Sequence, residues 1–497
     1  MQPCMRNDSF EAVLQSGAGR HPGKLFCSFD AVNGRVSYGE LNQRVERCAA
    51  ALGKAGLGAG ARVAIGLPPS PEFLVHLLAV MQAGGLAVPL GAEQHPEMLA
   101  SMLSVLDPHL VVKPAGPALT PVSCGPEPHC AWHWHRTAGD AAETVSARLG
   151  IFTSGSTSVP RCVLLSESNL LAGAKFVAEA HDLAAEDTVL CLMPLSHING
   201  IVTTVLAPLL TGGSVHYLQG SATPRGFQQA LEQTAATWFS AAPVHYRLLS
   251  YAPVKSQGFP HCRFGRSASA ALPIDVQQKF EALYGIPVVQ TMGLSECTGQ
   301  VFANPMPPAE RKFGSVGRAV GNIAEIVDAN DQVLPSGAVG EIRVKGPNVM
   351  LGYLGAQAET AEALRGDWLY TGDLGFRDYN GFFHVTGRKK LIANVGGHKV
   401  SLAAVEAAAA TLDCVAEAIA VARPDRGLGE IVDLYYTSGA KPRAGDPAVE
   451  RKRIRQVVSA VLPHHLALRD IRRLEELPRS ASGKVLRHRL ADCEDGD

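Results

Sequence analysis

The sequence predicts an α/β protein in which helices cover mainly parallel sheets. Three observations lead to this prediction. Helical and strand-like apolar patterns alternate through most of the 497 residues, and such alternation is typical of parallel sheets covered by helices. An apolar content of 46% in a chain of this length allows a large core and more than one domain. The pattern changes beyond Gly314, where short strands alternate with turn residues, and this change indicates a smaller β-rich subdomain.

The alternation begins near the N-terminus. Residues Leu41–Ala55 carry apolar side chains at helical spacing, and Ala61–Leu67 form a short, mostly apolar strand. A second helix is predicted at Phe73–Ala83, and the strand after it, Leu86–Val88, ends at Pro89. Helix and strand patterns of the same kind recur later in the chain, around Thr188–Met193, Ser214–Leu218, Gln277–Tyr284 and Pro287–Gln290.

The C-terminal part has a different organisation. Glu341–Lys345 and Gly381–Thr386 are predicted strands, and a basic segment with several glycines follows at 387–397. A compact α+β pattern comes next, with a helix at Leu402–Leu412, a strand at Ala416–Ala422, a helix at Pro447–Val461 and a polar tail. We therefore predict a large domain at residues 1–388 and a small domain at residues 389–497.

Charge and composition exclude several classes of protein. The formal net charge is −1, so the chain lacks the basic footprint that nucleic acids or anionic membranes require. Arg6, Asp8 and Glu11 interrupt the region where the apolar run of a signal peptide would lie. The apolar stretch Leu74–Leu90 is too short and too punctuated to span a bilayer. The 11 cysteines contain no C-x-x-C pair, a usage that suits the reduced cytoplasm.

The segment 153–161, TSGSTSVPR, is rich in glycine and hydroxyl side chains. It follows an apolar run at Ala147–Phe152, and a helix is expected directly after it. Such a loop presents backbone N–H groups and short hydroxyls to oxyanions, which is how proteins hold phosphates. The spacing of a Walker loop is absent. Taken alone, the segment is equally well interpreted as a solvated turn.

Five segments, in order along the chain, resemble the adenylate-forming superfamily of acyl-CoA synthetases, peptide-synthetase adenylation domains and luciferases. They are TSGSTSVPR at 153–161, PLSHING at 194–200, QTMGLSE at 290–296, YTGD at 370–373 with GR at 387–388, and PRSASGK at 478–484. The resemblance covers nearly the whole chain. It implies a large domain of αβαβα layers with a β-rich subdomain, and a small mobile C-terminal domain that rotates about a hinge at Lys390.

The resemblance also implies a nucleotide site and a catalytic group. Glu296 would help to bind Mg²⁺, a hard cation that prefers carboxylate oxygens. Asp373 would accept hydrogen bonds from the ribose hydroxyls, and Lys484 would neutralise charge that develops near the α-phosphate. The residues implied for ATP are Thr153, Ser154, Gly155, Ser156, Thr157, Arg161, Met292, Gly293, Ser295, Asp373 and Arg388, and those implied for catalysis are Lys484, Glu296 and His197.

The chain departs from the family pattern at several positions. Ser158 and Cys162 replace glycines of the phosphate loop, and Arg161 replaces its lysine. Arginine can still pair with phosphate, and it does so in a bidentate manner. Met292 stands where the family usually stacks an aromatic ring on adenine, and a thioether packs on a ring more weakly. We therefore expect looser nucleotide binding. Leu391 is a further departure.

The resemblance implies that a carboxylate attacks ATP, that acyl-AMP forms and pyrophosphate leaves, and that a nucleophile then takes the acyl group. His197 would gate the acid pocket, although a packing histidine is the alternative interpretation. The other implied pocket residues are Asn199, Val244, His245, Gln290 and Thr291. They suggest a small to medium acid that is mainly apolar or ring-bearing. An α-amino acid is disfavoured, because no Asp stands in the segment 194–200.

The identity of the nucleophile that takes the acyl group stays open at this point. Gly396 and Gly397 would let the thin pantetheine chain of CoA pass close to the backbone, which favours a thiol. Direct attack by an amine, as in coronafacate-ligase-like enzymes, uses the same first half-reaction. A third reading is a degenerate relative that binds nucleotide or acyl ligand without turnover. The expected partners are thus ATP, Mg²⁺, a carboxylic acid and CoA or an amine, with no nucleic acid or membrane, in a monomer or homodimer.

One further segment suggests a different function, the binding of a metal ion. His129, His133 and His135 would share one face of a strand, which could suit zinc. No second cluster of metal ligands lies nearby in the sequence, so we prefer an edge strand to a zinc site.

Overall fold

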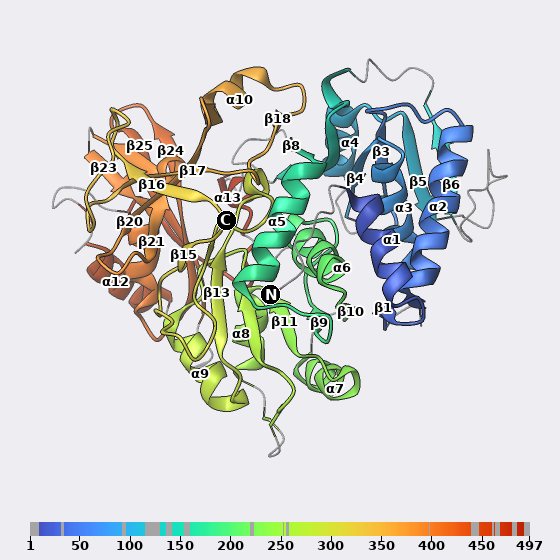
Figure 1. The fold of residues 1–497 in the computed structure, drawn as a ribbon. Helices are drawn as coiled ribbons and strands as arrows, with labels where there is room; N and C mark the ends of the chain where they lie inside the picture. Colours follow the sequence, from blue (N-terminus) through green and yellow to red (C-terminus); the bar gives the residue numbers. More distant parts are fainter. Residues whose placement is uncertain are drawn as a thin grey trace.

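The computed structural model describes most of the chain. Its described residues are 9–30, 34–91, 96–114, 130–135, 142–153, 160–218, 223–251, 253–254, 258–396, 398–438, 447–459, 462, 468–479 and 485–491. Elements of the large domain form two sheets with helices between and outside them, and a third sheet leads to the C-terminal elements (Figure 1).

The first sheet contains the strands that carry most of the predicted site. Its order within the described chain is β15-β14-β13-β12-β11-β9-β10-β1-β2, and the strands from β13 to β1 are parallel to one another. Since parallel strands need crossovers, helices separate them in sequence. The strands are β1 (Leu25–Phe29), β2 (Gly34–Ser37), β9 (Thr188–Cys191), β10 (Ser214–Tyr217), β11 (Trp238–Ala241), β12 (Phe264–Ser267), β13 (Val288–Met292), β14 (Phe302–Ala303) and β15 (Arg318–Ala319).

The second sheet has the order β18-β8-β7-β4-β3-β5-β6 within the described residues. Its strands are β3 (Arg62–Ile65), β4 (Leu86–Pro89), β5 (Leu110–Pro114), β6 (Cys130–Trp134), β7 (Ala147–Thr153), β8 (Arg161–Ser166) and β18 (Gly352–Tyr353). The prediction of a helix directly after the glycine-rich loop is wrong. Strand β8 returns antiparallel to β7 there, because Cys162–Leu165 is an apolar run that fills a buried strand, and the helix begins only after the N-cap Ser166.

Helices form the layers on both sides of these sheets. Those of the first 211 residues are α1 (Phe10–Arg20), α2 (Tyr38–Lys54), α3 (Pro71–Gln82), α4 (Pro96–Leu106), η1 (Ala142–Thr144), α5 (Glu167–Ala180), the π-helix η2 (Asn199–Leu206) and α6 (Ala207–Thr211). Helices α7 (Pro224–Thr234), α8 (Pro243–Leu249) and α9 (Ile274–Tyr284) pack on the opposite face of the first sheet, in a separate apolar cluster.

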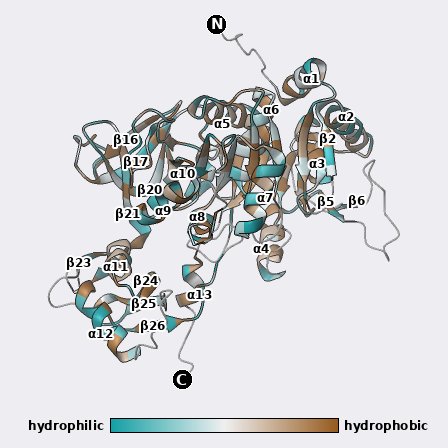
Figure 2. Cartoon of the chain, turned by 90° about the horizontal axis from the view of Figure 1, so that it is seen from below, coloured by the Kyte–Doolittle hydropathy of each residue, from teal (hydrophilic) through white to brown (hydrophobic). Residues whose placement is uncertain are grey.

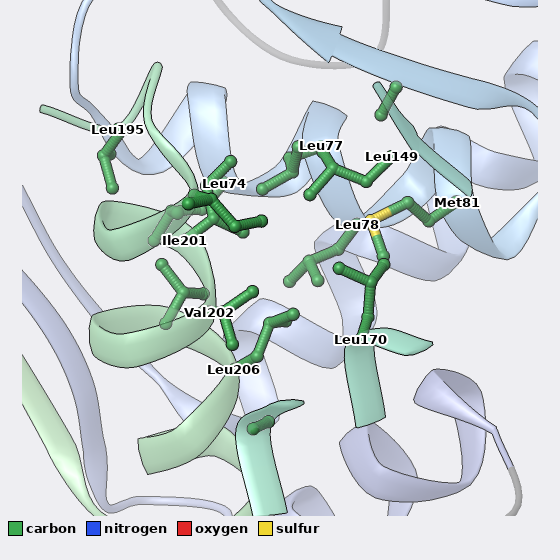
Figure 3. Close-up of a cluster of buried hydrophobic side chains, with 14 of the residues drawn as sticks. Leu74, Leu77, Leu78, Met81, Leu149, Leu170, Leu195, Ile201, Val202 and Leu206 are labelled. Atoms are coloured by element: carbon green, nitrogen blue, oxygen red, sulfur yellow. The ribbon is translucent and has the colours of Figure 1, made fainter. Parts of the chain in front are cut away.

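The main core lies between the two sheets. Leucines of α3, among them Leu74, Leu77 and Leu78, face Ile201 and Val202 of η2 (Figure 3). All five side chains are at most 1% exposed. Burying a leucine side chain contributes roughly 1.5–3 kcal/mol, so this layer fixes η2 against the rest of the domain. The predicted αβαβα layering is therefore confirmed.

The β-rich part follows residue 314. It is a sheet with the order β16-β17-β20-β19, and β21 pairs with β20. Its elements are β16 (Ile323–Val327), β17 (Gly340–Lys345), α10 (Gln357–Ala363), β19 (Leu364–Arg365), β20 (Trp368–Arg377) and β21 (Phe383–Arg388). The β-rich subdomain expected from the sequence is present.

The C-terminal elements form their own sheet and their own apolar cluster. Figure 2 shows them gathered to one side of the other elements. After η4 (Lys389–Leu391), they are β22 (Ile392–Val395), β23 (His398–Ser401), α11 (Leu402–Ala410), β24 (Val415–Asp425), β25 (Gly429–Ser438), α12 (Pro447–Val458), β26 (Ile471–Leu474) and α13 (Arg487–Ala491). The polar tail of the prediction thus contains a strand and a helix.

Candidate active site

Part of the predicted site lies along one edge of the first sheet. Segments that follow the carboxyl ends of β9, β11, β12 and β13 carry His197, His245, Ser269 and Glu296, respectively. Parallel strands end at a common edge, and this edge is where α/β proteins bind ligands. Ser269 was not predicted from the sequence; it lies there because β12 is a neighbour of β11 and β13.

A tyrosine joins the two groups that were predicted to meet phosphate and metal. The Tyr353 hydroxyl donates a hydrogen bond to Glu296 Oε1 over 2.9 Å, and the Arg161 guanidinium lies 5.5 Å from the centre of the Tyr353 ring. Burial and the Glu296 carboxylate raise the pKa of Tyr353, so the hydroxyl keeps its proton and remains a donor. The cluster therefore gathers a cation over the face of the Tyr353 ring and a carboxylate at its hydroxyl.

Close backbone packing places Glu296. A Cβ atom on Gly293 would lie 1.3 Å from the carbonyl oxygen of Gly299, so only glycine fits at this position. The turn that follows is η3 (Ser295–Cys297), and the Glu296 carbonyl accepts a hydrogen bond from the backbone N–H of Met350 over 2.9 Å. Met292, at the end of β13, is partly buried and pairs with Phe302 of β14.

Asp373 and Arg388 form the second cluster. Arg388 Nε donates to Asp373 Oδ1 over 2.6 Å across the pair β20–β21. Asp373 is 2% exposed, whereas the Arg388 side chain is 52% exposed. Gly372 precedes the carboxylate with a φ of +71°, a conformation that favours glycine. The structure thus brings together the two residues that the sequence predicted for ribose and its neighbourhood.

The sequence suggested a mainly apolar acid, but two of the candidate residues for its pocket are buried and polar. Asn199 and Gln290 are 7% and 5% exposed. Within the described residues, Asn199 Oδ1 and Gln290 Oε1 have no hydrogen-bond partner. Asn199 Nδ2 donates to Ser269 Oγ over 3.3 Å, and Thr291 Oγ1 donates to the Ser267 carbonyl over 3.0 Å. Buried polar groups are normally paired, so the two free oxygens point to a polar ligand.

Of the remaining pocket candidates, His245 and Val244 lie on α8, whereas His197 lies just before η2. His245 Nδ1 accepts a hydrogen bond from the Ala242 backbone N–H over 3.1 Å, which places the ring proton on Nε2. Burial lowers the pKa of His245, and the ring is therefore a neutral donor at pH 7. Val244 is 42% exposed on the surface of α8, and His197 is partly buried.

Several predicted residues lie outside the described residues. These are Ser154, Gly155, Ser156, Thr157 and Ser158 of the phosphate loop, together with Gly397, Lys484 and His129. Thr153 ends β7 and Arg161 begins β8, on either side of the loop. Residues 479 and 485, which flank the segment of Lys484, pair as an antiparallel bridge. Arg479 also forms an ion pair with Glu417 of β24.

One contact joins the first sheet's site edge to the C-terminal elements. Arg247 of α8 donates to the carbonyl oxygen of Ala416 over 3.0 Å, so the edge that carries the site touches the C-terminal sheet. Lys390 is exposed in η4, between the sheet that ends at Arg388 and the sheet that begins at Ile392. Gly396 has a φ of +57°, which is the left-handed region.

Two other expectations concern metals and membranes. In the described part of the chain, no three His, Cys, Asp or Glu side chains gather as a metal site would require. His133 is partly buried on β6, and His135 follows that strand. None of the described helices combines the length and apolar character needed to cross a bilayer.

Comparison with known proteins adds the following findings. The model of the AMP-binding enzyme family matches residues 14–354, and that of the AMP-binding enzyme C-terminal domain matches residues 404–484. The sulfoacetate–CoA ligase of Cupriavidus necator is 32% identical over 97% of both chains. The oxalate–CoA ligase of Arabidopsis thaliana is 28% identical over 98% of this chain and 99% of its own. The structure of ATP-bound MatB from Rhodopseudomonas palustris is similar with a TM-score of 0.82 and 25% identity, covering 97% of this chain and 99% of that chain.

Proposed function

Because the chain belongs to the AMP-binding enzyme family, we propose that it is an ATP-dependent carboxylate–CoA ligase that works through an acyl-adenylate. The observation that carries this proposal is the cluster in which Tyr353 contacts Glu296 through its hydroxyl and Arg161 through the face of its ring. It combines a cation suited to phosphate oxygens with a carboxylate suited to a hard metal ion. The named relatives are CoA ligases, which favours a thiol over an amine as the acceptor.

The reaction proceeds in two steps. A carboxylate oxygen of the acid attacks the α-phosphorus of ATP, an acyl–O–P bond forms, and pyrophosphate leaves. The CoA thiolate then attacks the acyl carbon, a thioester forms, and AMP leaves. The protein contributes mainly positioning and stabilisation of charge. Asp373 would hold the ribose, Arg161 and the loop at 153–161 would bind phosphate, and Lys484 would face the α-phosphate.

Magnesium fits this arrangement through Glu296. The carboxylate is partly exposed at the edge of the sheet and is oriented by Tyr353, and carboxylate oxygens are ligands that Mg²⁺ prefers. When bound, the ion neutralises charge on the phosphates of ATP.

Pyrophosphate release tests the proposal. The purified protein is incubated with ATP, Mg²⁺ and a mixture of carboxylic acids, and CoA or an amine pool is then added to separate samples. We expect pyrophosphate in the first step and an acyl-CoA, detected by mass spectrometry, in the CoA sample only. Amide products would shift the assignment to an amide ligase. If the protein neither releases pyrophosphate nor exchanges it into ATP, the remaining interpretation is a degenerate relative that binds ligands without turnover.

Replacing Met292 with tyrosine is expected to tighten ATP binding by about 1 kcal/mol, within the range of aromatic stacking energies. Residue 292 is partly buried at the end of β13, where the resemblance places the adenine. Isothermal titration with a non-hydrolysable ATP analogue measures the change. An unaltered affinity would show that this side chain does not meet the adenine.

Replacing Tyr353 with phenylalanine is expected to raise the Mg²⁺ concentration for half-maximal activity about fivefold. The change removes the hydroxyl that orients Glu296, and a single hydrogen bond contributes about 1 kcal/mol. The ring below Arg161 is retained. Tyr379→Phe serves as the control, because Tyr379 is 90% exposed. Identical Mg²⁺ titrations for both variants would contradict a role for the hydroxyl.

A further inference from the structure

The segment that carries Lys484 is anchored to the C-terminal domain on both of its sides. Residues 479 and 485 pair as an antiparallel bridge. On the downstream side, Arg487 of α13 donates from Nη2 to Glu406 Oε2 of α11 over 3.0 Å. On the upstream side, residue 479 forms an ion pair with a carboxylate of β24. An extended chain spans at most about 3.6 Å per residue, so these anchors limit where Lys484 can reach.

Glu417 is the carboxylate that holds the upstream anchor, and it also faces the large domain. Its Oε2 accepts a hydrogen bond from Arg479 Nη2, and its Oε1 lies 3.9 Å from Nη1 of Arg247 on α8. The side chains of Glu417, Arg247 and Arg479 are 33%, 36% and 24% exposed, so water screens their charges less than those of a fully exposed pair. One carboxylate therefore links a cation of the large domain to the cation that precedes the Lys484 segment.

An irregularity in β24 gives Arg247 a second contact with the C-terminal domain. The register between β24 and β25 shifts between Val415 and Glu417, which makes Ala416 the extra residue of a β-bulge. Such a residue is left out of the ladder, and the carbonyl oxygen of Ala416 accepts a hydrogen bond from Arg247 Nη1 over 3.0 Å. Arg247 follows His245, a candidate of the acid pocket, by two residues on α8. The helix proposed to lie beside the acid therefore contacts the strand that carries Glu417.

We propose that Glu417 is a positioning residue for acyl-adenylate formation, because it holds the segment that carries Lys484 against the large domain. This inference rests on the proposed function and assigns a further residue to its first step. The effect of Glu417 on the reaction passes through Arg479 and Lys484 rather than through contact with ATP or the acid. The α-phosphorus is not attacked when CoA takes the acyl group, so Glu417 contributes to adenylation and not to transfer.

Separate measurements of the two half-reactions test this role, with pyrophosphate exchange for adenylation and acyl-CoA formation from synthetic acyl-AMP for transfer. We expect Glu417→Gln to slow adenylation about fivefold, the effect of one partly exposed ion pair, and to change transfer less than about twofold. Glu417→Asp keeps the charge and should lose less adenylation than Glu417→Gln. The control is Asp413→Asn, which breaks an exposed pair with Arg453 in the same domain and should leave both rates unchanged. An equal loss in both steps, or no loss in either, would overturn the inference.

Double substitutions show whether Glu417 acts through the residues named. If Glu417 positions Lys484, Glu417→Gln should cause no further loss of adenylation in a protein that already carries Lys484→Ala, since residues that act as one unit are not additive. Arg247→Gln is expected to slow adenylation by a factor similar to that of Glu417→Gln, and the two together by less than the product of their separate factors. Independent, multiplicative losses in either pair would overturn the inference.

Limited proteolysis without substrates separates this inference from the proposed function. Trypsin cleaves after lysine, and the rate at which it cuts the bond after Lys484 reports how often that segment opens. We expect this cleavage to be about two- to fivefold faster in Glu417→Gln than in the unmodified protein and in Asp413→Asn. Faster cleavage in a protein that never releases pyrophosphate would support the anchoring by Glu417 and contradict the ligase. An unchanged rate in Glu417→Gln would overturn the inference, even where the unmodified protein forms acyl-CoA.

Discussion

Replacing Lys484 with alanine is expected to slow acyl-adenylate formation about 100- to 1,000-fold, the usual cost of removing one group that stabilises charge in a transition state. The reason is the resemblance of residues 478–484 to the C-terminal motif of the family, whose lysine neutralises the α-phosphate. Transfer of the acyl group from supplied acyl-AMP to CoA is expected to stay within about threefold, because the α-phosphorus is not attacked in that step. Pyrophosphate exchange measures the first step, and acyl-CoA formation from synthetic acyl-AMP measures the second.

A matched control distinguishes this role from a general loss of positive charge. Lys452 is an exposed lysine of α12 in the same domain, and Lys452→Ala is expected to leave both steps unchanged. The flanks of Lys484 are held by the bridge between residues 479 and 485, so loss of one side chain between them should not unfold the domain. An equal loss in both half-reactions would exclude a role specific to adenylation.

Replacing Asp373 with alanine is expected to raise the KM for ATP at least about tenfold. The change removes a 2% exposed carboxylate and leaves the Arg388 guanidinium without its 2.6 Å contact. Hydrogen bonds to a charged group contribute about 1.5–3 kcal/mol, which corresponds to about 10- to 150-fold in affinity. The KM for the carboxylic acid should change much less, since the residues proposed for the acid lie along the first sheet and Asp373 lies on β20 of another sheet.

The exposed carboxylate of Asp367 offers the control for this substitution. It lies shortly before β20 and pairs with Lys345 at the surface, and its loss should leave the KM for ATP unaltered. A KM for ATP that is also unaltered in Asp373→Ala would exclude contact between residue 373 and the nucleotide. If Asp373→Ala lowers the thermal stability as well, an Asp373→Asn variant keeps the shape of the side chain and reports on the charge alone.

Local patterns in the sequence were sufficient to predict much of the fold. The helix expected at Leu402–Leu412 is α11, Leu402–Ala410, and the strand expected at Glu341–Lys345 is β17, Gly340–Lys345, because each has the apolar spacing of a surface element with one buried side. Strand β8 was missed because a short apolar run such as Cys162–Leu165 suits a buried helix or a buried strand equally well.

The site was predictable where a motif is contiguous and unpredictable where distant residues meet. Glu296 and Asp373 stand in short motifs, whereas Tyr353 meets Glu296 across 57 residues and Asn199 meets Ser269 across 70. Only the folded sheet brings these pairs together.

The π-helix η2 has a consequence for the placement of Asn199, one of the residues proposed to contact the acid. Asn199 is its first residue, and Gly200 packs so tightly that a Cβ atom would lie 2.2 Å from the carbonyl oxygen of Pro194. A π-helical turn holds one residue more than an α-helical turn, and each residue of an α-helix turns the chain by about 100°. Loss of a single residue within 201–206 would therefore rotate Asn199 relative to α6, which follows η2 directly. Insertions and deletions in this segment, and not only substitutions, are therefore expected to change how the Asn199 side chain is presented.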